Sequence, residues 1–195
     1  MELHEVTIKG WKETLLMPIS DVQLGAAGCD EDRFKRHIDW GVKNDAMFIS
    51  LGDMVDMMSP SNRSRYKHSE LYDDTKMSVD DRAQQYVERF LNLVKGTEGR
   101  WAAGFTSGHH YHEFEDGTTS DTRIAKALKA PFLGDSAFVR FRFVSTGIKG
   151  KMGKSASVVL KIQHGEGSGI KAATPLDKLE RQLGAFEADI YLIAH

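Results

Sequence analysis

The feature that most constrains this chain is a set of polar clusters, each placed at the end of a short apolar stretch. The stretches are bounded by turn residues, which is typical of buried strands. They are Leu15 to Ile19, Met47 to Leu51, Ala102 to Thr106, Val158 to Ile162 and Ile190 to Ile193. The clusters that follow them are Ser20 to Gln23, Gly52 to Asp56, Gly108 to His110, Gln163 to Gly165 and Ala194 to His195. Strands of a layered α/β fold deliver their C-terminal loops to a common edge, so we expect these clusters to form one site.

Apolar residues at helical spacing predict helices between these strands. The predicted helices begin at Asp30, at Ser78, near Ser120 and at Thr174. Phe138 to Val144 alternates between apolar and polar residues, which predicts a strand with one solvated face. Residues 57–77 lack a clear period, and we expect a long loop or small cap there, beside the second cluster. The predicted order is βαβαβ, an antiparallel section, and then βαβ.

The composition is that of an ordinary globular protein, with 41% hydrophobic and 28% charged residues in a chain of 195. This length suffices for one sizeable core, so we expect a single domain over residues 1–195. The net charge of -2 gives no global basic field for nucleic acid. A single cysteine, Cys29, and the absence of a signal peptide or a membrane-spanning run predict an intracellular protein of the reducing cytoplasm that does not bind membranes.

The residue types in the clusters suit a pair of divalent metal ions. Two hard ions that lie close together need a bridging carboxylate, further oxygen donors, and imidazoles that fix the geometry. Asp21, Gln23 and Asp53 supply oxygens, and His109, His110, His164 and His195 supply nitrogens. Such ions, ~3.5 to 4 Å apart, activate a water molecule and neutralise charge on a phosphoryl group. The sequence therefore predicts a hydrolase of phosphate esters.

In the order and spacing of these clusters the chain resembles the calcineurin-like metallophosphoesterase superfamily. The family pattern D-x-H, G-D-x-x-D, G-N-H-[DE], H and G-H-x-H is matched by Asp21-Val22-Gln23, Gly52-Asp53-Met54-Val55-Asp56, Gly108-His109-His110-Tyr111, His164 and Ala194-His195. The resemblance is closest to bacteriophage and prophage members, through Ser59 to Arg63, Leu133-Gly134 with the strand that follows, and Lys178 to Arg181. It implies an α/β fold in which a two-sheet β-sandwich is flanked by helices, in a form that can lack its last strands. If the protein is phage-encoded, the host cytoplasm is the expected location.

The resemblance also implies a role for each matched residue. Asp21 and Gln23 would bind the first metal, and Asp53 would bridge both metals. The second metal would be completed by His109, His164 and His195, and His110 would protonate the leaving group or hold the phosphate. Asp56 is expected to orient a loop or a ligand, and His112 to be a surface residue or a partner of a ligand.

Four departures from the family pattern alter these expectations. Gln23 replaces a histidine and offers an amide oxygen, whereas His109 replaces an asparagine and offers an imidazole nitrogen. For these donors we expect two divalent ions, with Mn²⁺ as the preferred metal and Zn²⁺, Fe²⁺, Ni²⁺ or Mg²⁺ as alternatives. Tyr111 replaces an acid, so the partner that orients His110 must come from elsewhere, with Glu113 as a candidate. The family has a further histidine two positions beyond His195. Without it the first site has only oxygen donors and is expected to bind metal weakly.

Three functions remain open at this point. The first is a phosphatase or phosphodiesterase, the second is a DNA-processing nuclease, and the third is a catalytically silent binding or structural module that keeps the fold. Arg63 and Arg65, with Lys67 and His68, are candidate contacts to substrate, although a run of charges more often forms a solvated face.

Overall fold

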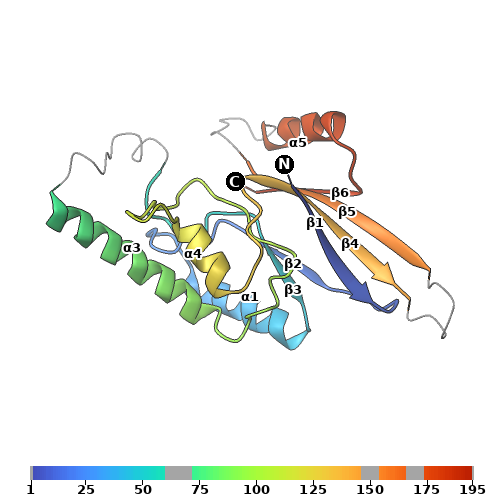
Figure 1. The fold of residues 1–195 in the computed structure, drawn as a ribbon, viewed down its shortest axis with the longest axis horizontal. Coiled ribbons are helices and arrows are strands. Elements are labelled where there is room, and N and C mark those ends of the chain that lie inside the picture. Colours follow the sequence, from blue (N-terminus) through green and yellow to red (C-terminus); the bar gives the residue numbers. More distant parts are fainter. Residues whose placement is uncertain (1, 60–71, 146–153, 166–173, 195) are drawn as a thin grey trace.

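The computed structural model describes residues 2–59, 72–145, 154–165 and 174–194, which form a mixed α/β fold (Figure 1). The strands are β1 (Glu2–Lys9), β2 (Leu16–Ile19), β3 (Met47–Ser50), β4 (Ser136–Val144), β5 (Ser155–His164) and β6 (Ile190–Ala194). The helices are α1 (Glu31–Lys43), α3 (Asp73–Leu93), α4 (Ser120–Ala127) and α5 (Thr174–Ala185). None of the helices in the described ranges is long and apolar enough to cross a lipid bilayer.

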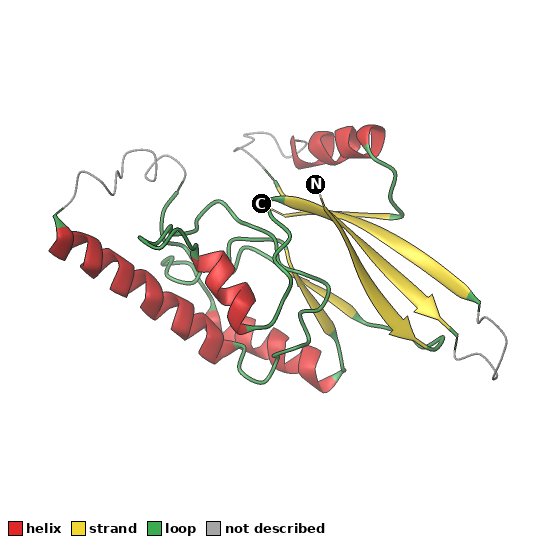
Figure 2. Cartoon of the chain, in the orientation of Figure 1, coloured by secondary structure: helices red, strands yellow, loops and turns green. Residues whose placement is uncertain are grey.

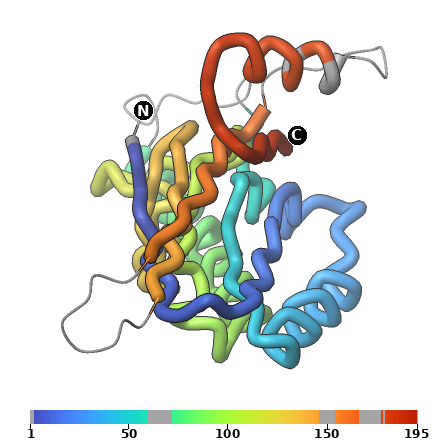
Figure 3. Tube along the Cα trace, turned by 90° about the vertical axis from the view of Figure 1, so that its right-hand side faces the viewer, coloured from blue at the N-terminus to red at the C-terminus, as the bar shows by residue number. Residues whose placement is uncertain are grey.

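The strands form two separate sheets. One sheet has four strands in the order β1-β4-β5-β6, and the other consists of β2 and β3. The β4–β5 pair is antiparallel, as the alternating pattern of β4 suggested, whereas β1–β4, β5–β6 and β2–β3 are parallel. Figure 3 shows β1, in blue, running alongside the orange strands β4 and β5, far from it in the sequence.

The two-stranded sheet is the middle layer of the molecule, because it is buried on both faces. Successive side chains of a strand point to opposite faces, and β3 uses both. Phe48 packs in a core with helices α1, α3 and α4, whereas Ile49 packs in a second core against the four-stranded sheet. Both side chains are completely buried. A strand that is covered on both sides reads as a continuous apolar run, as Met47 to Leu51 does.

Helix α5 covers the outer face of the larger sheet, apart from the other helices (Figure 2). The ring of Phe186, just after α5, meets the ring of Phe138 edge-on, with centroids 5.9 Å apart. Lys161 of β5 is the cross-strand partner of Phe138, and its Nζ is 5.6 Å from the Phe138 ring and 5.1 Å from the Phe186 ring. Burial lowers the pKa of Lys161.

Three of the predicted helix starts are confirmed and one is wrong. Asp30 caps α1 by accepting a hydrogen bond from the Arg33 N–H, and α4 and α5 begin where expected. Ser78 does not cap α3, which begins at Asp73. Its hydroxyl instead donates to the carbonyl oxygen of Asp74 inside the helix. The predicted loop over residues 57–77 is therefore wrong for 73–77, while 60–71 lie outside the described residues.

The strand prediction failed at two places. Ala102 to Thr106 is not a strand, since only Phe105 forms isolated bridges, with Ser50 and Phe132. The chain turns instead at Gly104, which has a φ of +116° and donates its N–H to the Trp101 carbonyl. Strand β1 was not predicted, because only Val6 and Ile8 of this strand are buried apolar residues and most of the other residues are polar or charged.

Candidate metal centre

Three of the predicted ligands lie together in the structure. Asp21, Asp53 and His164 each place one ligand atom within 4.8 Å of the ligand atoms of the other two. Asp21 follows β2, Asp53 follows β3, and His164 ends β5, so both sheets contribute. The expectation that strand ends meet at one edge is confirmed for these three clusters.

Asp53 is held by the turn that contains the third motif. Its Oδ1 accepts hydrogen bonds from the backbone N–H groups of His109, at 2.5 Å, and His110, at 2.9 Å. Its Oδ2 lies 3.1 Å from Nε2 of His164. Burial raises the pKa of Asp53, but hydrogen bonds from His164 and from the two N–H groups outweigh it and lower the pKa to about 2. The carboxylate is therefore ionised at neutral pH.

Gly108 permits this close approach of the turn to Asp53. A Cβ atom at position 108 would lie 2.0 Å from Oδ1 of Asp53 and 2.1 Å from its backbone nitrogen. The Gly108 N–H donates to Oδ2 of Asp121, a buried residue in the first turn of α4, at 2.8 Å. The turn is thus anchored on one side by α4 and on the other by Asp53.

His164 is oriented by the backbone. Its Nδ1 lies 2.7 Å from the carbonyl oxygen of Leu51, so Nδ1–H donates and Nε2 faces Asp53. A backbone acceptor for the second ring nitrogen is typical of metal-binding histidines. Burial lowers the pKa of His164, but the hydrogen bond and the charge of Asp53 outweigh it and raise the pKa above 6.5.

The loop after β2 has an unusual backbone. Asp21 and Gln23 have φ angles of 50° and 46°, and Asp53 in the neighbouring loop has 57°. These left-handed conformations are uncommon for residues other than glycine and cluster at functional sites. The Asp21 N–H donates to the Gly52 carbonyl, and the Gln23 N–H to the Asp53 carbonyl, which joins the two loops. The Ser20 hydroxyl donates to Oδ2 of Asp21.

The remaining predicted ligands are placed less closely. The His109 ring meets the His164 ring edge-on with centroids 4.7 Å apart, but His109 is not in the group of three. Gln23 is placed by its backbone beside Asp53. His195 and the proposed substrate contacts Arg63 and Arg65 lie outside the described residues.

His110, the predicted catalytic residue, has a different partner from the one expected. Its Nδ1 lies 2.7 Å from Oδ1 of Asp56, so the candidate Glu113 is wrong as the orienting acid. The N–H groups of Met57 and Met58 both donate to the His110 carbonyl, which docks the two loops against each other. The second aspartate of G-D-x-x-D was the signal for this contact, and the expectation that Asp56 orients a ligand or loop agrees with it.

His112 is a buried residue, so its assignment to the surface is wrong. Its side chain is 1% exposed and its Nε2 lies 2.7 Å from Oδ1 of Asp80 in α3. Its N–H donates to the Ser120 hydroxyl at the start of α4. Asp80 and Asp121 were both missed as supports of the site. In the sequence each looks like an ordinary acidic residue in the first turn of a predicted helix. Only the packing of α3 and α4 in the structure places its side chain against the site.

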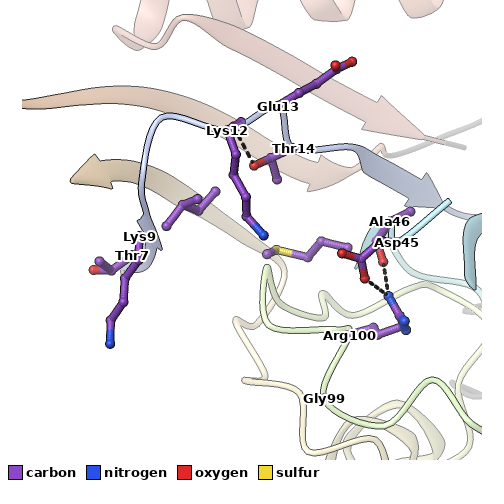
Figure 4. Close-up of a pocket in the computed structure, with 11 residues that line it drawn as sticks. Thr7, Lys9, Lys12, Glu13, Thr14, Asp45, Ala46, Gly99 and Arg100 are labelled. Atoms are coloured by element: carbon purple, nitrogen blue, oxygen red, sulfur yellow. Dashed lines mark hydrogen bonds and ion pairs between the residues drawn. The ribbon is translucent and has the colours of Figure 1, made fainter. Parts of the chain in front are cut away.

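Two cavities bear on the position of a substrate. A cavity of about 310 Å³ is lined by His109 and His164 and so adjoins the three ligands. A larger one, about 370 Å³, lies at the opposite end of β3 around Asp45, Lys12 and Arg100 (Figure 4). There Arg100 pairs with Asp45 at 2.8 Å, and the cavity contains none of the predicted ligands. The smaller cavity is therefore the candidate substrate site.

No family model, curated protein or solved structure matches this chain. The chemistry of the site therefore has to be argued from its geometry and its residue types.

Proposed function

We propose that this chain is a metal-dependent phosphoester hydrolase, with the two-sheet sandwich of the calcineurin-like metallophosphoesterases. The observation that carries the proposal is the convergence of Asp21, Asp53 and His164 within 4.8 Å of one another, from three separate strand ends. The order of the motifs along the chain and the two facing sheets support the same family.

The donor set fits a divalent cation. Two carboxylates face one imidazole, and Asp53 is ionised and largely buried. Buried charges are normally paired or coordinate a metal. Mixed carboxylate and imidazole ligands suit Mn²⁺, Zn²⁺ or Fe²⁺. Two bound ions would supply an activated water molecule and would neutralise charge on the phosphoryl oxygens. Gln23 is assigned to the ion of Asp21, and His109 and His195 to the ion of His164, with Asp53 between them.

The chain itself supplies a proton donor beside this centre. His110 supplies one of the two N–H groups that hold Asp53, and its side chain is 28% exposed. Because Nδ1 is occupied by Asp56, Nε2 is the atom that can hand a proton to the oxygen of a leaving group. The carboxylate of Asp56 fixes the ring orientation.

The proposal is tested by metal titration and by hydrolysis of bis-p-nitrophenyl phosphate with added Mn²⁺. We expect Mn²⁺-dependent hydrolysis, and about one tightly bound ion per chain, with a second binding near millimolar concentrations. As a matched control, Asp39→Asn removes an exposed carboxylate from α1 and should leave both properties unchanged. A folded protein that binds no divalent ion would overturn the proposal, and one that binds metal but cleaves no phosphoester would be a silent binding module. Cleavage of labelled DNA separates the nuclease from the other enzymes.

A further inference from the structure

The cavity beside His164 is a polar pocket. It is lined by the turn around Gly108 and His109, by the start of β4 and by the end of β5. Strands β4 and β5 are neighbours in the sheet. The residues are Ser107, Gly108, His109, Tyr111, Asp135, Ser136, Gln163 and His164. A volume of about 310 Å³ is at the lower end of the range for small-molecule sites, and suits one group the size of a sugar or a nucleoside.

The charge of this pocket restricts what can bind there. Among the described residues that line it there is no lysine or arginine. Asp135 is exposed at the pocket and contributes a negative charge. A phosphate monoester carries about two negative charges at neutral pH, since its second pKa is ≈ 6. A phosphodiester carries one, so a diester meets less repulsion from Asp135.

The other lining groups are neutral hydrogen-bonding side chains. Gln163 is oriented from outside the pocket, because its Oε1 accepts a hydrogen bond from Nε2 of Gln182 in α5 at 2.9 Å. The amide NH₂ of Gln163 is therefore the end that can donate to a ligand. Ser107 and Ser136 add hydroxyl groups, and Tyr111 adds an aromatic ring. These groups match a ligand with hydroxyl or carbonyl oxygens and an apolar face.

We infer that the substrate is a phosphodiester whose second ester group is uncharged and rich in hydrogen-bonding groups, such as a sugar or a nucleoside. This inference depends on the proposed function and specifies its substrate class. The diester phosphorus lies at the metal centre, and its uncharged ester group occupies the pocket beside His164. Asp135 acts as a specificity residue that disfavours monoesters.

The first experiment compares kcat/KM in Mn²⁺ for p-nitrophenyl phosphate, bis-p-nitrophenyl phosphate and the p-nitrophenyl ester of thymidine 5′-monophosphate. All three release the same chromophore. We expect both diesters to exceed the monoester by at least about tenfold, with the nucleoside ester the best of the three. A monoester rate equal to or above the diester rates would overturn the substrate class and leave the proposed function intact. Hydrolysis of none of the three would overturn the proposed function itself.

The second experiment tests Asp135 directly. Asp135→Asn should raise kcat/KM for the monoester about three- to tenfold and so narrow the preference for diesters, because the repulsion is partly screened by solvent. Asp39→Asn changes the net charge of the protein equally but lies outside the pocket, and should leave the preference unchanged. The preference of the unsubstituted protein should also shrink in 0.5 M salt. An unaltered ratio in Asp135→Asn, or the same change in both variants, would overturn the role of Asp135.

Discussion

Nδ1 of His110 lies 2.7 Å from Oδ1 of Asp56, which joins the second motif of the chain to the third. Both side chains are partly exposed, at 28% and 33%. The contact makes Asp56 the orienting group of the proposed proton donor, and Tyr111, the residue after His110, lines the adjacent cavity.

This relationship predicts a graded loss of activity. His110→Asn should lower kcat by about 10² to 10⁴, the range that general acid catalysis supplies, without changing the metal content. Asp56→Asn should lower kcat less, because it removes the orienting charge and keeps the ring. Kinetics with a poor alkoxide leaving group and with p-nitrophenolate provide the check. The loss in His110→Asn should shrink for p-nitrophenolate, which needs little protonation, and equal losses for both leaving groups would contradict an acid role.

Asp53→Asn should weaken the first Mn²⁺ binding step by at least about tenfold while the fold is kept. The amide oxygen of asparagine can still accept from the N–H groups of His109 and His110, but the charge that attracts the cation is gone. Calorimetric titration with circular dichroism measures both properties. Unchanged metal affinity in this variant would mean that the bridging ligand is misassigned.

Gly108→Ala should impair metal binding through the backbone alone. A Cβ at this position would lie 2.0 Å from Oδ1 of Asp53, so the turn has to move and the two N–H groups lose their carboxylate. We expect a drop of about 2 kcal/mol or more in unfolding free energy together with weaker Mn²⁺ binding. Gly184→Ala in α5 is the matched control. Nothing lies within 4 Å of its added Cβ, so stability should be unchanged or slightly higher.

The metal-free protein should be most stable in weak acid. The pKa of Asp53 is lowered from 3.8 to about 2, so its contribution is present above pH 3.8 and is lost as the pH falls toward 2. The pKa of His164 is raised above 6.5, so its contribution is complete below pH 6.5 and is lost as the pH rises through the raised value. Urea midpoints in EDTA between pH 3 and 9 measure this.

The alkaline loss is the diagnostic part of that profile. His164→Asn should flatten it, whereas His37→Asn, a substitution on the exposed side of α1, should not. Saturating Mn²⁺ should also remove it, because metal binding displaces the proton from His164. An alkaline loss that persists in His164→Asn would assign it to another group.

Lys161→Met should raise the unfolding free energy by about 1 kcal/mol near neutral pH. The ammonium is buried under α5 between two aromatic rings, and methionine of similar length avoids its desolvation. Because burial lowers the pKa of Lys161, the unsubstituted protein should gain stability as the pH rises toward 10.5, and the variant should lose that gain. Chemical denaturation at pH 7 and pH 10 compares the two. A destabilised variant would show that the contacts of the cation with Phe138 and Phe186 outweigh its desolvation.

The sequence predicted those parts of the fold that depend on local pattern. The buried run at Met47 to Leu51 became a strand, and Asp30 and Ser120 marked helix starts. The run at Ala102 to Thr106 is equally apolar, but Gly104 turns the chain before a ladder can form. The run is buried by packing and not by pairing in a sheet. The pattern of apolar residues alone does not distinguish these two cases.

The candidate site could be predicted where residues of a metal-binding type stand at strand ends. It could not be predicted where a contact depends on how two loops pack against each other. Asp21, Asp53 and His164 lie at or just after the ends of strands and come together there. The choice between Glu113 and Asp56 as the partner of His110 depends on how two loops dock. That docking is set by backbone hydrogen bonds, which the residue types do not encode.

The left-handed backbone at Asp21, Gln23 and Asp53 has a consequence for anyone engineering this protein. Each of these positions carries a conformational cost that glycine does not have. Directed evolution that rewards heat resistance alone would therefore drift toward glycine at Asp21 and Gln23, and each accepted change would look like an improvement in the assay, whereas Asp53 would be kept by the hydrogen bonds that it accepts from His109 and His110. The most heat-resistant variants from such a screen would be those that had lost proposed metal-binding side chains, so a selection on this chain must include metal binding from its first round.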